Sequence, residues 1–272
     1  MVKMLIMEEK MSTFAEYIFS EKDLIKKIEI MSFLKKKNKI YFDTSVIMKT
    51  EILREFIEVM KIDVDENLVV TACLMHDCLK VETPEEMYKI KNMDNEYRSY
   101  FDSLGFSKEF SDICVGHNRK NKIDSRPKEC DLLEIADQFG AMLLNRSDRL
   151  AYEVKEAIDI IKNENLKEED NQYLGTFEEF IDIMEGMEVL QLGLITRFQK
   201  DMNCLKRDDI SGAVRELYNT FERNKKCFEI KEAELRKGGD LLEELKKARA
   251  KLKLLEEAPV LPGFSEDDIK FD

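Results

Sequence analysis

The sequence predicts an all-α fold. Its 272 residues include only ten Gly and four Pro, and 37% of them are charged. Such a composition, rich in Glu and Lys, is typical of helices rather than of loop-rich or β-rich proteins. Apolar residues also recur at steps of three and four, which is the period of a helix that buries one face. With 43% hydrophobic residues, the chain can bury a sizeable core.

The N-terminal part is expected to consist of helices that pack on the body of the protein. Residues 1–42 show apolar positions spaced for one or two amphipathic helices. The apolar set from Ile52 to Met60 predicts a further helix, which ends near "KIDVDEN". The acidic residues of that segment favour the start of the next helix, and His76 and Asp77 come near its C-terminal end.

The middle of the chain carries clear helix start and stop signals. "TPEE" at 83–86 is a capping box that begins a helix, which Gly105 ends. Ser107 can cap a short helix that ends at His117. Pro127 begins the helix that carries Asp137. A helix over 148–163 and a charged linker follow.

The remainder, residues 166–272, is expected to be a helical extension. Thr176 caps a helix that continues to about Met202, and Asp208 or Asp209 begins another that ends at Gly238-Gly239. A last helix stops at Pro259. The acidic tail after it has no helical period and is either disordered or a docking segment.

Charge and composition exclude several classes of function. The net charge of −13 and the pI near 4.9 argue against a general nucleic-acid binder, and we interpret the basic run 35–39 as a solvated helix end. No apolar run approaches the ~20 residues of a membrane span. The six Cys lack the spacing of a disulfide framework and no secretory signal precedes them, so we expect reduced thiols and a cytoplasmic location.

Three side chains stand out as candidate metal ligands. His76 and Asp77 lie side by side in the otherwise apolar "TACLMHDCLK", and burying an ionisable pair costs several kcal/mol unless a partner compensates it. Neighbours on a helix lie about 100° apart, so both can reach one ion beside that turn. Asp137 occupies another apolar helix and also needs a partner. A divalent metal ion would compensate all three.

These segments resemble the HD-domain metal-dependent phosphohydrolases. "ACLMHDCLK" is similar to that family's A-x-L-H-D-hydrophobic-x-K segment, and "EIADQFGAMLLNRSDRLAY" to the Asp-bearing segment of the branch that cleaves cyclic dinucleotides. The resemblance covers about residues 43–165 and implies an HD-type helical domain there, with N- and C-terminal helical extensions. It implies His76, Asp77 and Asp137 as metal ligands, Lys80 as a basic residue facing phosphate, and Arg146 or Arg149 as the phosphate-binding arginine, with Arg149 preferred.

The chain also departs from the family pattern. The first family histidine should fall between Asp43 and Thr50, where no histidine occurs, so Asp43 or Ser45 would have to serve instead. "VGHNRK" resembles a His-His-Glu segment, which makes His117 a match for a second-metal histidine, but the Gly-Tyr-Pro motif that should follow is absent. The ion, Mn²⁺, Mg²⁺ or Fe²⁺, is therefore held more weakly than by four ligands, or has been lost.

Alternatives for single residues stay open at this point. His117 is also an ordinary residue for a solvated helix end, where it interacts with the helix dipole. Structural zinc at Cys73, Cys78, Cys114 and His117 is conceivable, although Cys73 and Cys78 point in different directions on a helix. Arg146 and Arg149 are equally compatible with exposed ion pairs.

Two functions of different classes remain. In the first, the chain is a metal-dependent phosphohydrolase acting on a small phosphorylated substrate or nucleotide: Asp77 or Asp137 orients or deprotonates water, and Lys80 and Arg149 offset the charge on the phosphoryl oxygens. In the second, the fold has lost its chemistry and serves as a binding or scaffold module, which engages a protein partner through its C-terminal helices.

Overall fold

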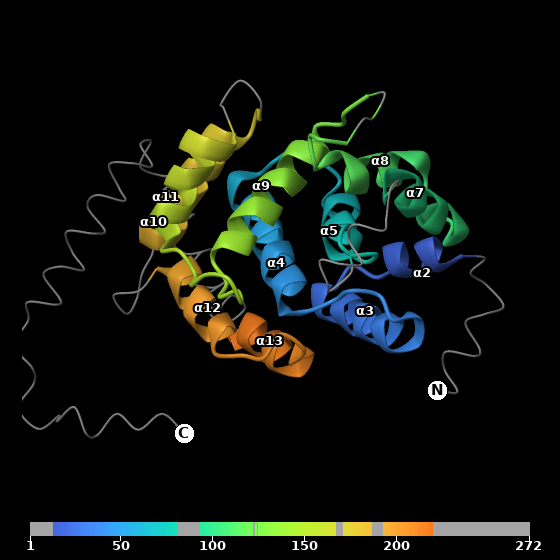
Figure 1. Ribbon diagram of the computed structural model, residues 1–272, viewed down its shortest axis with the longest axis horizontal. Coiled ribbons are helices and arrows are strands. Elements are labelled where there is room, and N and C mark those ends of the chain that lie inside the picture. Colours follow the sequence, from blue (N-terminus) through green and yellow to red (C-terminus); the bar gives the residue numbers. More distant parts are fainter. Residues whose placement is uncertain are drawn as a thin grey trace, which may run out of the picture.

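The computed structural model describes residues 13–80, 93–121, 123, 125–166, 171–186 and 193–219. Within these ranges every regular element is a helix and no strand occurs, so the prediction of an all-α fold is confirmed (Figure 1). The capping box at 83–86, the helices expected after residue 219 and the acidic tail lie outside the described residues. The three predicted segments 1–42, 43–165 and 166–272 stay a prediction.

The first four helices each begin at a capped residue. They are α2 (Phe14–Ser20), α3 (Leu24–Asn38), α4 (Thr44–Met60) and α5 (Glu66–Met75). Thr13, Asp23, Asp43 and Asp65 accept hydrogen bonds from backbone N–H groups of the respective first turns, which are otherwise unpaired. The expected start of α4 at Ile52 is wrong, because the Asp43 cap begins this helix well before it.

The next helices agree with the sequence signals in part: the helix expected over 148–163 begins only at Val154. They are α7 (Met93–Ser103), α8 (Lys108–Gly116), α9 (Glu129–Met142), α10 (Val154–Ile160) and the π-helix η1 (Ile161–Asn165). Gly105 adopts a φ of 85°, a left-handed conformation that suits glycine, and it separates α7 from α8. Ser107 caps α8 through the N–H of Phe110.

The described part of the C-terminal extension differs from the expectation. It contains α11 (Leu174–Gly186), α12 (Leu194–Asn203) and α13 (Ile210–Leu217). Thr176 lies inside the first turn of α11 and does not cap it, and the expected single helix from Thr176 to Met202 is two helices. Gly193, with an extended ψ of 155°, precedes α12. Asp209 caps α13 as expected, by accepting from the N–H of Gly212.

Helix α4 lies at the centre of the molecule. It packs against α5 and α9 and also against α11, α12 and α13 (Figure 1). Phe177 of α11 places its ring 4.9 Å from that of Phe56 on α4 and 5.1 Å from that of Phe139 on α9. Because α4 is covered on several sides, even charged residues such as Lys49 and Glu51 are buried in it.

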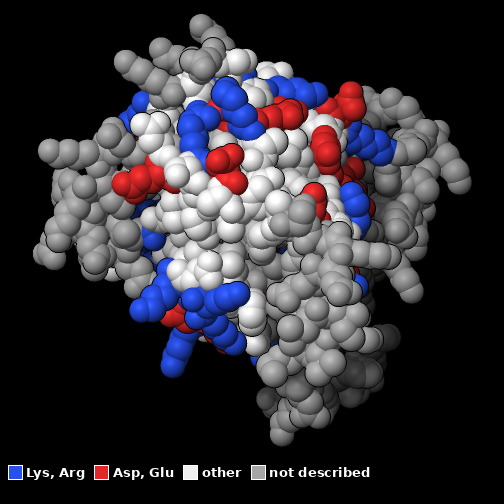
Figure 2. Space-filling view, turned by 90° about the vertical axis from the view of Figure 1, so that its right-hand side faces the viewer, with Lys and Arg blue, Asp and Glu red and all other residues white. Residues whose placement is uncertain are grey.

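The surface has a basic edge at the end of α3. Figure 2 shows the face of the molecule that carries α2, α3 and α7, with basic side chains gathered low on it, at the level of α3 in Figure 1. Lys36, Lys37 and Lys39 are exposed there, and Lys36 and Lys37 lie in the last turn of the helix, where cations interact favourably with its dipole. None of the helices in the described ranges has the length and hydropathy needed to cross a membrane.

Candidate metal centre

His76 follows the last residue of α5 and is 2% exposed. Its Nδ1 atom lies 2.7 Å from the carbonyl oxygen of Cys73. A carbonyl can only accept a hydrogen bond, so Nδ1 carries the proton and Nε2 faces the other way. Nε2 lies 3.1 Å from an oxygen of Asp137 and 3.4 Å from an oxygen of Asp77.

His117 repeats this arrangement at the end of α8. Its Nδ1 donates to the carbonyl of Cys114 over 2.7 Å, and its ring centroid lies 5.0 Å from that of His76. Burial, with a smaller effect of His76, lowers the pKa of His117 to about 4. The imidazole is therefore neutral near pH 7, and its Nε2 lone pair is available to a ligand. His117 thus ends α8, as expected, but is half-buried rather than fully exposed.

Asp137 of α9 completes a group of three. Ligand atoms of His76, His117 and Asp137 all lie within 4.8 Å of one another. Donors bound to a single ion at about 2 Å are separated by roughly 3–4 Å, so the group fits a divalent ion after small adjustments. Hydrogen bonds from Nδ1 to carbonyls are the outer contacts that orient metal-binding imidazoles in many proteins.

Lys49 occupies the interval in which the first family histidine was expected. This residue of α4 is 2% exposed, and its Nζ lies 2.6 Å from Asp137 Oδ1 and 3.2 Å from Asp77 Oδ2. Burial would lower the pKa of Lys49, but Asp137 and Asp77 raise it well above its ordinary value, so the ammonium stays charged. Sequence reasoning missed this residue because it placed the start of the helix after it.

Asp43 and Ser45, the expected substitute ligands, are engaged elsewhere. Asp43 caps α4 through the N–H groups of Ser45 and Val46 and accepts a hydrogen bond of 2.7 Å from the hydroxyl of Tyr41. Neither belongs to the group of three described above. Their role is to begin α4 and so to place Lys49.

The two carboxylates next to Lys49 remain ionised. Burial would raise the pKa of both, yet His76 and Lys49 hold that of Asp77 below its ordinary value. The same competition, with Lys49 as the strongest stabilising partner, holds the pKa of Asp137 well below its ordinary value. The centre therefore offers two negative charges to the cations around it.

A glycine on α9 makes room for Lys49. A Cβ atom at Gly140 would lie 2.6 Å from Lys49 Cγ and 3.2 Å from Lys49 Cα. Atoms do not approach that closely without a shift of one of them. Because Gly140 has no side chain, the aliphatic part of Lys49 can pack closely against α9, and the ammonium group can reach Asp137.

Comparison with known families decides the identity of this region. Residues 46–142, which span α4 to α9 and hold every side chain of the centre, match the family model described as HD domain. Residues 46–142 are thereby assigned to an HD domain. A search of curated proteins found no match, and neither did a search of solved structures. The HD assignment indicates a superfamily of metal-dependent hydrolases, in agreement with the grouped His76, His117 and Asp137.

The remaining predicted residues of the HD domain are partly separated from its centre. Lys80 Nζ lies 3.4 Å from Asp77 Oδ2 and 5.3 Å from the ring centroid of Tyr41. Lys80 also lines a cavity of about 600 Å³. Arg149 donates to the carbonyls of Ala141, Met142 and Leu150, which satisfies the end of α9. Arg146 lines the cavity, whereas Arg149 is not among the residues that do.

The cysteine alternative for zinc has no support in the described residues. Cys73, Cys78 and Cys114 are buried free thiols, and burial raises the pKa of each. A thiol must lose its proton to bind zinc. The group that can hold an ion contains no cysteine.

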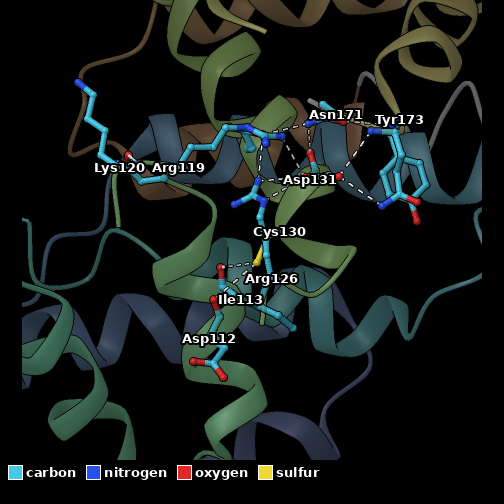
Figure 3. A network of polar contacts seen from close by, with 12 residues as sticks. Asp112, Ile113, Arg119, Lys120, Arg126, Cys130, Asp131, Asn171 and Tyr173 are labelled. Carbon is cyan, nitrogen blue, oxygen red and sulfur yellow. Dashed lines mark hydrogen bonds and ion pairs between the residues drawn. The ribbon is translucent and has the colours of Figure 1, made fainter. Parts of the chain in front are cut away.

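An ion-pair network holds the loop that follows His117. Arg119 and Arg126 both contact Asp131 and Glu134 of α9, at distances between 2.8 and 3.2 Å (Figure 3). Asn171, which is 1% exposed, donates to the Asp131 carbonyl and to Glu134. The network fixes the loop against the helix that carries Asp137, and so supports the position of His117.

Proposed function

We propose that the HD domain binds one divalent ion through His76, His117 and Asp137 and hydrolyses a phosphoester of a small molecule such as a nucleotide. The observation that carries this proposal is the pair of imidazoles whose Nδ1 atoms donate to carbonyls 2.7 Å away. With Nδ1 engaged, Nε2 is the atom that each ring can offer to a ligand; that of His76 lies 3.1 Å from Asp137, and a ligand atom of His117 lies within 4.8 Å of both residues. Two ordinary buried histidines have no need to converge in this way.

The donor set favours some ions over others. Two imidazoles and one carboxylate suit Mn²⁺, Fe²⁺ or Zn²⁺ better than Mg²⁺, which prefers oxygen ligands and retains water. Asp77, 3.4 Å from His76 Nε2, is near enough to contribute a further oxygen. Our proposal is therefore Mn²⁺, Fe²⁺ or Zn²⁺ rather than Mg²⁺.

The surrounding side chains have separate tasks in this proposal. When bound, a divalent ion lowers the pKa of water and polarises a phosphoryl oxygen. The ionised Asp77 accepts a hydrogen bond from the attacking water and orients it. Lys80 and Arg146, which line the 600 Å³ cavity, offset the charge that develops on the phosphoryl oxygens. A second cavity of about 430 Å³ is lined by His117 and Asp137.

Metal content and hydrolysis test the proposal directly. Protein purified without chelator should contain about one ion per chain and should hydrolyse bis(p-nitrophenyl) phosphate in Mn²⁺. Asp137→Asn keeps the size of the side chain and should remove both properties. Asp182→Asn, an exposed substitution on α11, is the matched control. A wild-type protein that binds no Mn²⁺ and hydrolyses nothing would overturn the proposal.

Lys49 supports a second candidate function. Its ammonium already compensates Asp77 and Asp137, so this fold does not depend on an ion for its stability. In that case the domain is a binding or scaffold module, and its protein partner engages the part of the chain after residue 219, where the sequence predicts helices. A melting temperature that EDTA leaves unchanged, together with absent hydrolysis, is the result expected for this candidate.

We also infer a cytoplasmic location. Five cysteines lie in the described residues, and all are free thiols. Unpaired thiols are typical of reducing compartments. Fractionation of cells that express the tagged chain tests this inference.

A further inference from the structure

The cavity of about 600 Å³ opens on the Lys49 side of the centre. Its walls come from four places in the chain: the segment from α3 to α4, the turn after α5, the end of α9 with its following loop, and the loop between α12 and α13. Its volume lies within the range of small-molecule sites. The cavity thus lies between the HD domain and the helices of the extension that follows it.

Five cationic side chains line this cavity: Lys35, Lys49, Lys80, Arg146 and Arg207. Each is paired with a carboxylate: Lys35 with Asp208, Lys49 and Lys80 with Asp77, Arg146 with Asp148 over 3.1 Å and Arg207 with Asp43 over 3.4 Å. The Arg146 and Arg207 side chains are 51% and 62% exposed, and a guanidinium has five N–H donors, so both arginines keep donors for an anion in the cavity.

Lys49 forms the buried end of this cavity. An ammonium has three N–H donors, and two of them meet Asp77 and Asp137. The third can therefore reach an oxygen of a ligand in the cavity. Because Lys49 is held by two carboxylates and by the close approach of Gly140, its charge needs no rearrangement when an anion arrives.

Arg207 also lines the cavity, although it lies outside residues 46–142, which match the HD domain. Its carbonyl accepts a hydrogen bond from the N–H of Thr44 over 3.0 Å, and its Nε lies 3.4 Å from Asp43. Lys35 and Asp208 form an ion pair beside it. These contacts hold the loop between α12 and α13 against the start of α4, so Arg207 is a fixed part of the cavity wall.

The uncharged walls indicate an organic ligand. Phe42, Ala141 and Leu144 line the cavity together with the ring of Tyr41. Phe42 and Leu144 are buried, whereas Tyr41 and Ala141 are partly exposed. Inorganic phosphate would leave the exposed apolar surface of Tyr41 and Ala141 in contact with water, whereas a ligand with an organic part covers it. The combination of cations and apolar walls suits a phosphate monoester.

We propose that this cavity binds an organic phosphate monoester through Lys49, Arg146 and Arg207, and that this binding requires no divalent ion. Lys49 supplies a positive charge at the buried end of the cavity. The proposal does not depend on the proposed hydrolysis, since it is expected to hold in the presence of EDTA.

Calorimetric titration of the full chain in EDTA tests this proposal, with AMP, glucose 6-phosphate and inorganic phosphate as probes. At least one of the two organic phosphates should bind saturably and more tightly than inorganic phosphate. Arg207→Gln should weaken that binding about tenfold, the usual value of one charge-assisted hydrogen bond. Arg215→Gln, an exposed substitution on α13, is the matched control and should leave it unchanged.

A second variant tests the buried end of the cavity. Lys49→Met removes the ammonium and should reduce binding further than Arg207→Gln does. If Lys49→Met fails to fold, the comparison of Arg207→Gln with Arg215→Gln decides, because the Arg207 side chain is 62% exposed and its removal leaves the core intact.

The outcomes separate this proposal from the proposed hydrolysis. Binding of neither organic phosphate in EDTA, or equal binding by Arg207→Gln and Arg215→Gln, overturns it. Binding that appears only after Mn²⁺ is added overturns it as well, but leaves the hydrolase standing. Binding in EDTA by a protein that hydrolyses nothing in Mn²⁺ supports it and removes the hydrolase.

Discussion

The ammonium of Lys49 lies 2.6 Å from the carboxylate of Asp137, although 88 residues separate the two in the chain. Lys49 belongs to α4 and Asp137 to α9, the two helices that cross at the centre of the molecule. The positive charge of Lys49 thus lies in the part of the HD domain where the family pattern places a metal-binding histidine. Metal affinity, local packing and ligand binding all depend on this contact.

The first prediction concerns metal affinity. Lys49→His removes a positive charge beside the ion and adds an imidazole ligand. A unit charge at ~4 Å is worth several kcal/mol at an effective dielectric constant of about 20, so Mn²⁺ binding should tighten at least about tenfold. Titration calorimetry measures the change. Lys36→His, an exposed substitution on α3, is the control, and unchanged Mn²⁺ affinity in Lys49→His would contradict the role given to Lys49.

The second prediction concerns Gly140. Replacing a helical Gly by Ala normally stabilises a helix by up to about 1 kcal/mol. At Gly140 the new Cβ would lie 2.6 Å from Lys49 Cγ, and such overpacking costs about 1–3 kcal/mol. Gly140→Ala should therefore lower the free energy of unfolding by about 1–2 kcal/mol, as measured by urea denaturation.

Gly175 provides the matched control for this variant. It lies in the first turn of α11, and a Cβ there meets no atom within 4 Å. Gly175→Ala should be neutral or stabilising. Equal free energies of unfolding for the two variants would show that Lys49 does not press against α9.

The sequence was sufficient to predict the convergence of His76 and Asp137 but not the residue between them. Both stand out as ionisable residues on apolar helices, and the resemblance to a known family implied that they are ligands of the same metal ion. Lys49 follows Val46, Ile47 and Met48, and a lysine in such a run is equally compatible with an exposed helix position. The Lys49 side chain points inward only because α4 crosses α9 at this position.

The phosphate-facing arginine could not be chosen from the sequence either. Arg146 and Arg149 are three residues apart in the loop after α9. The carbonyls at the end of that helix lack partners, and the Arg149 guanidinium satisfies them. Which of two arginines caps the helix depends on the path of the loop, and sequence spacing does not encode that path.

The third prediction concerns the attachment of the extension. Asn171 donates to the Asp131 carbonyl over 3.0 Å and to Glu134 over 3.1 Å in a buried setting. Asn171→Ala removes two buried hydrogen bonds, each worth about 0.5–1.5 kcal/mol, so it should lower the free energy of unfolding by about 1–3 kcal/mol. It should also speed proteolysis near α11. Asn163→Ala, exposed in η1, is the control, and equal stability of the two variants would contradict the structural role of Asn171.

The fourth prediction concerns a buried lysine far from the centre. Lys27 is 1% exposed and donates to the Ile18 carbonyl over 2.8 Å and to Thr71 Oγ1 over 2.7 Å. Burial, and next the charge of Lys22, lowers the pKa of Lys27 from 10.5 to about 8. Lys27 therefore loses its proton in the folded chain at a lower pH than in the unfolded chain.

The sign of the pH dependence follows from proton binding. Between pH 8 and 10.5 the unfolded chain holds the Lys27 proton more strongly than the folded chain. The Lys27 contribution to the free energy of unfolding should rise with pH in that window, by up to ~1.4 kcal/mol per pH unit, and should be constant below it. Other groups also titrate there, but they are shared by wild type and Lys27→Met, so the difference between the two isolates Lys27.

Lys26→Met is the matched control for this measurement. The Lys26 side chain is 63% exposed, and its ammonium lies 3.9 Å from Glu21. Urea denaturation at pH 7, 8, 9 and 10 should give a wild-type-minus-Lys27→Met difference that grows with pH above 8, and a wild-type-minus-Lys26→Met difference that stays flat. Parallel curves for all three proteins would mean that Lys27 keeps its ordinary pKa in the fold. Its two oxygen acceptors would then be enough to hold a charged ammonium in the core.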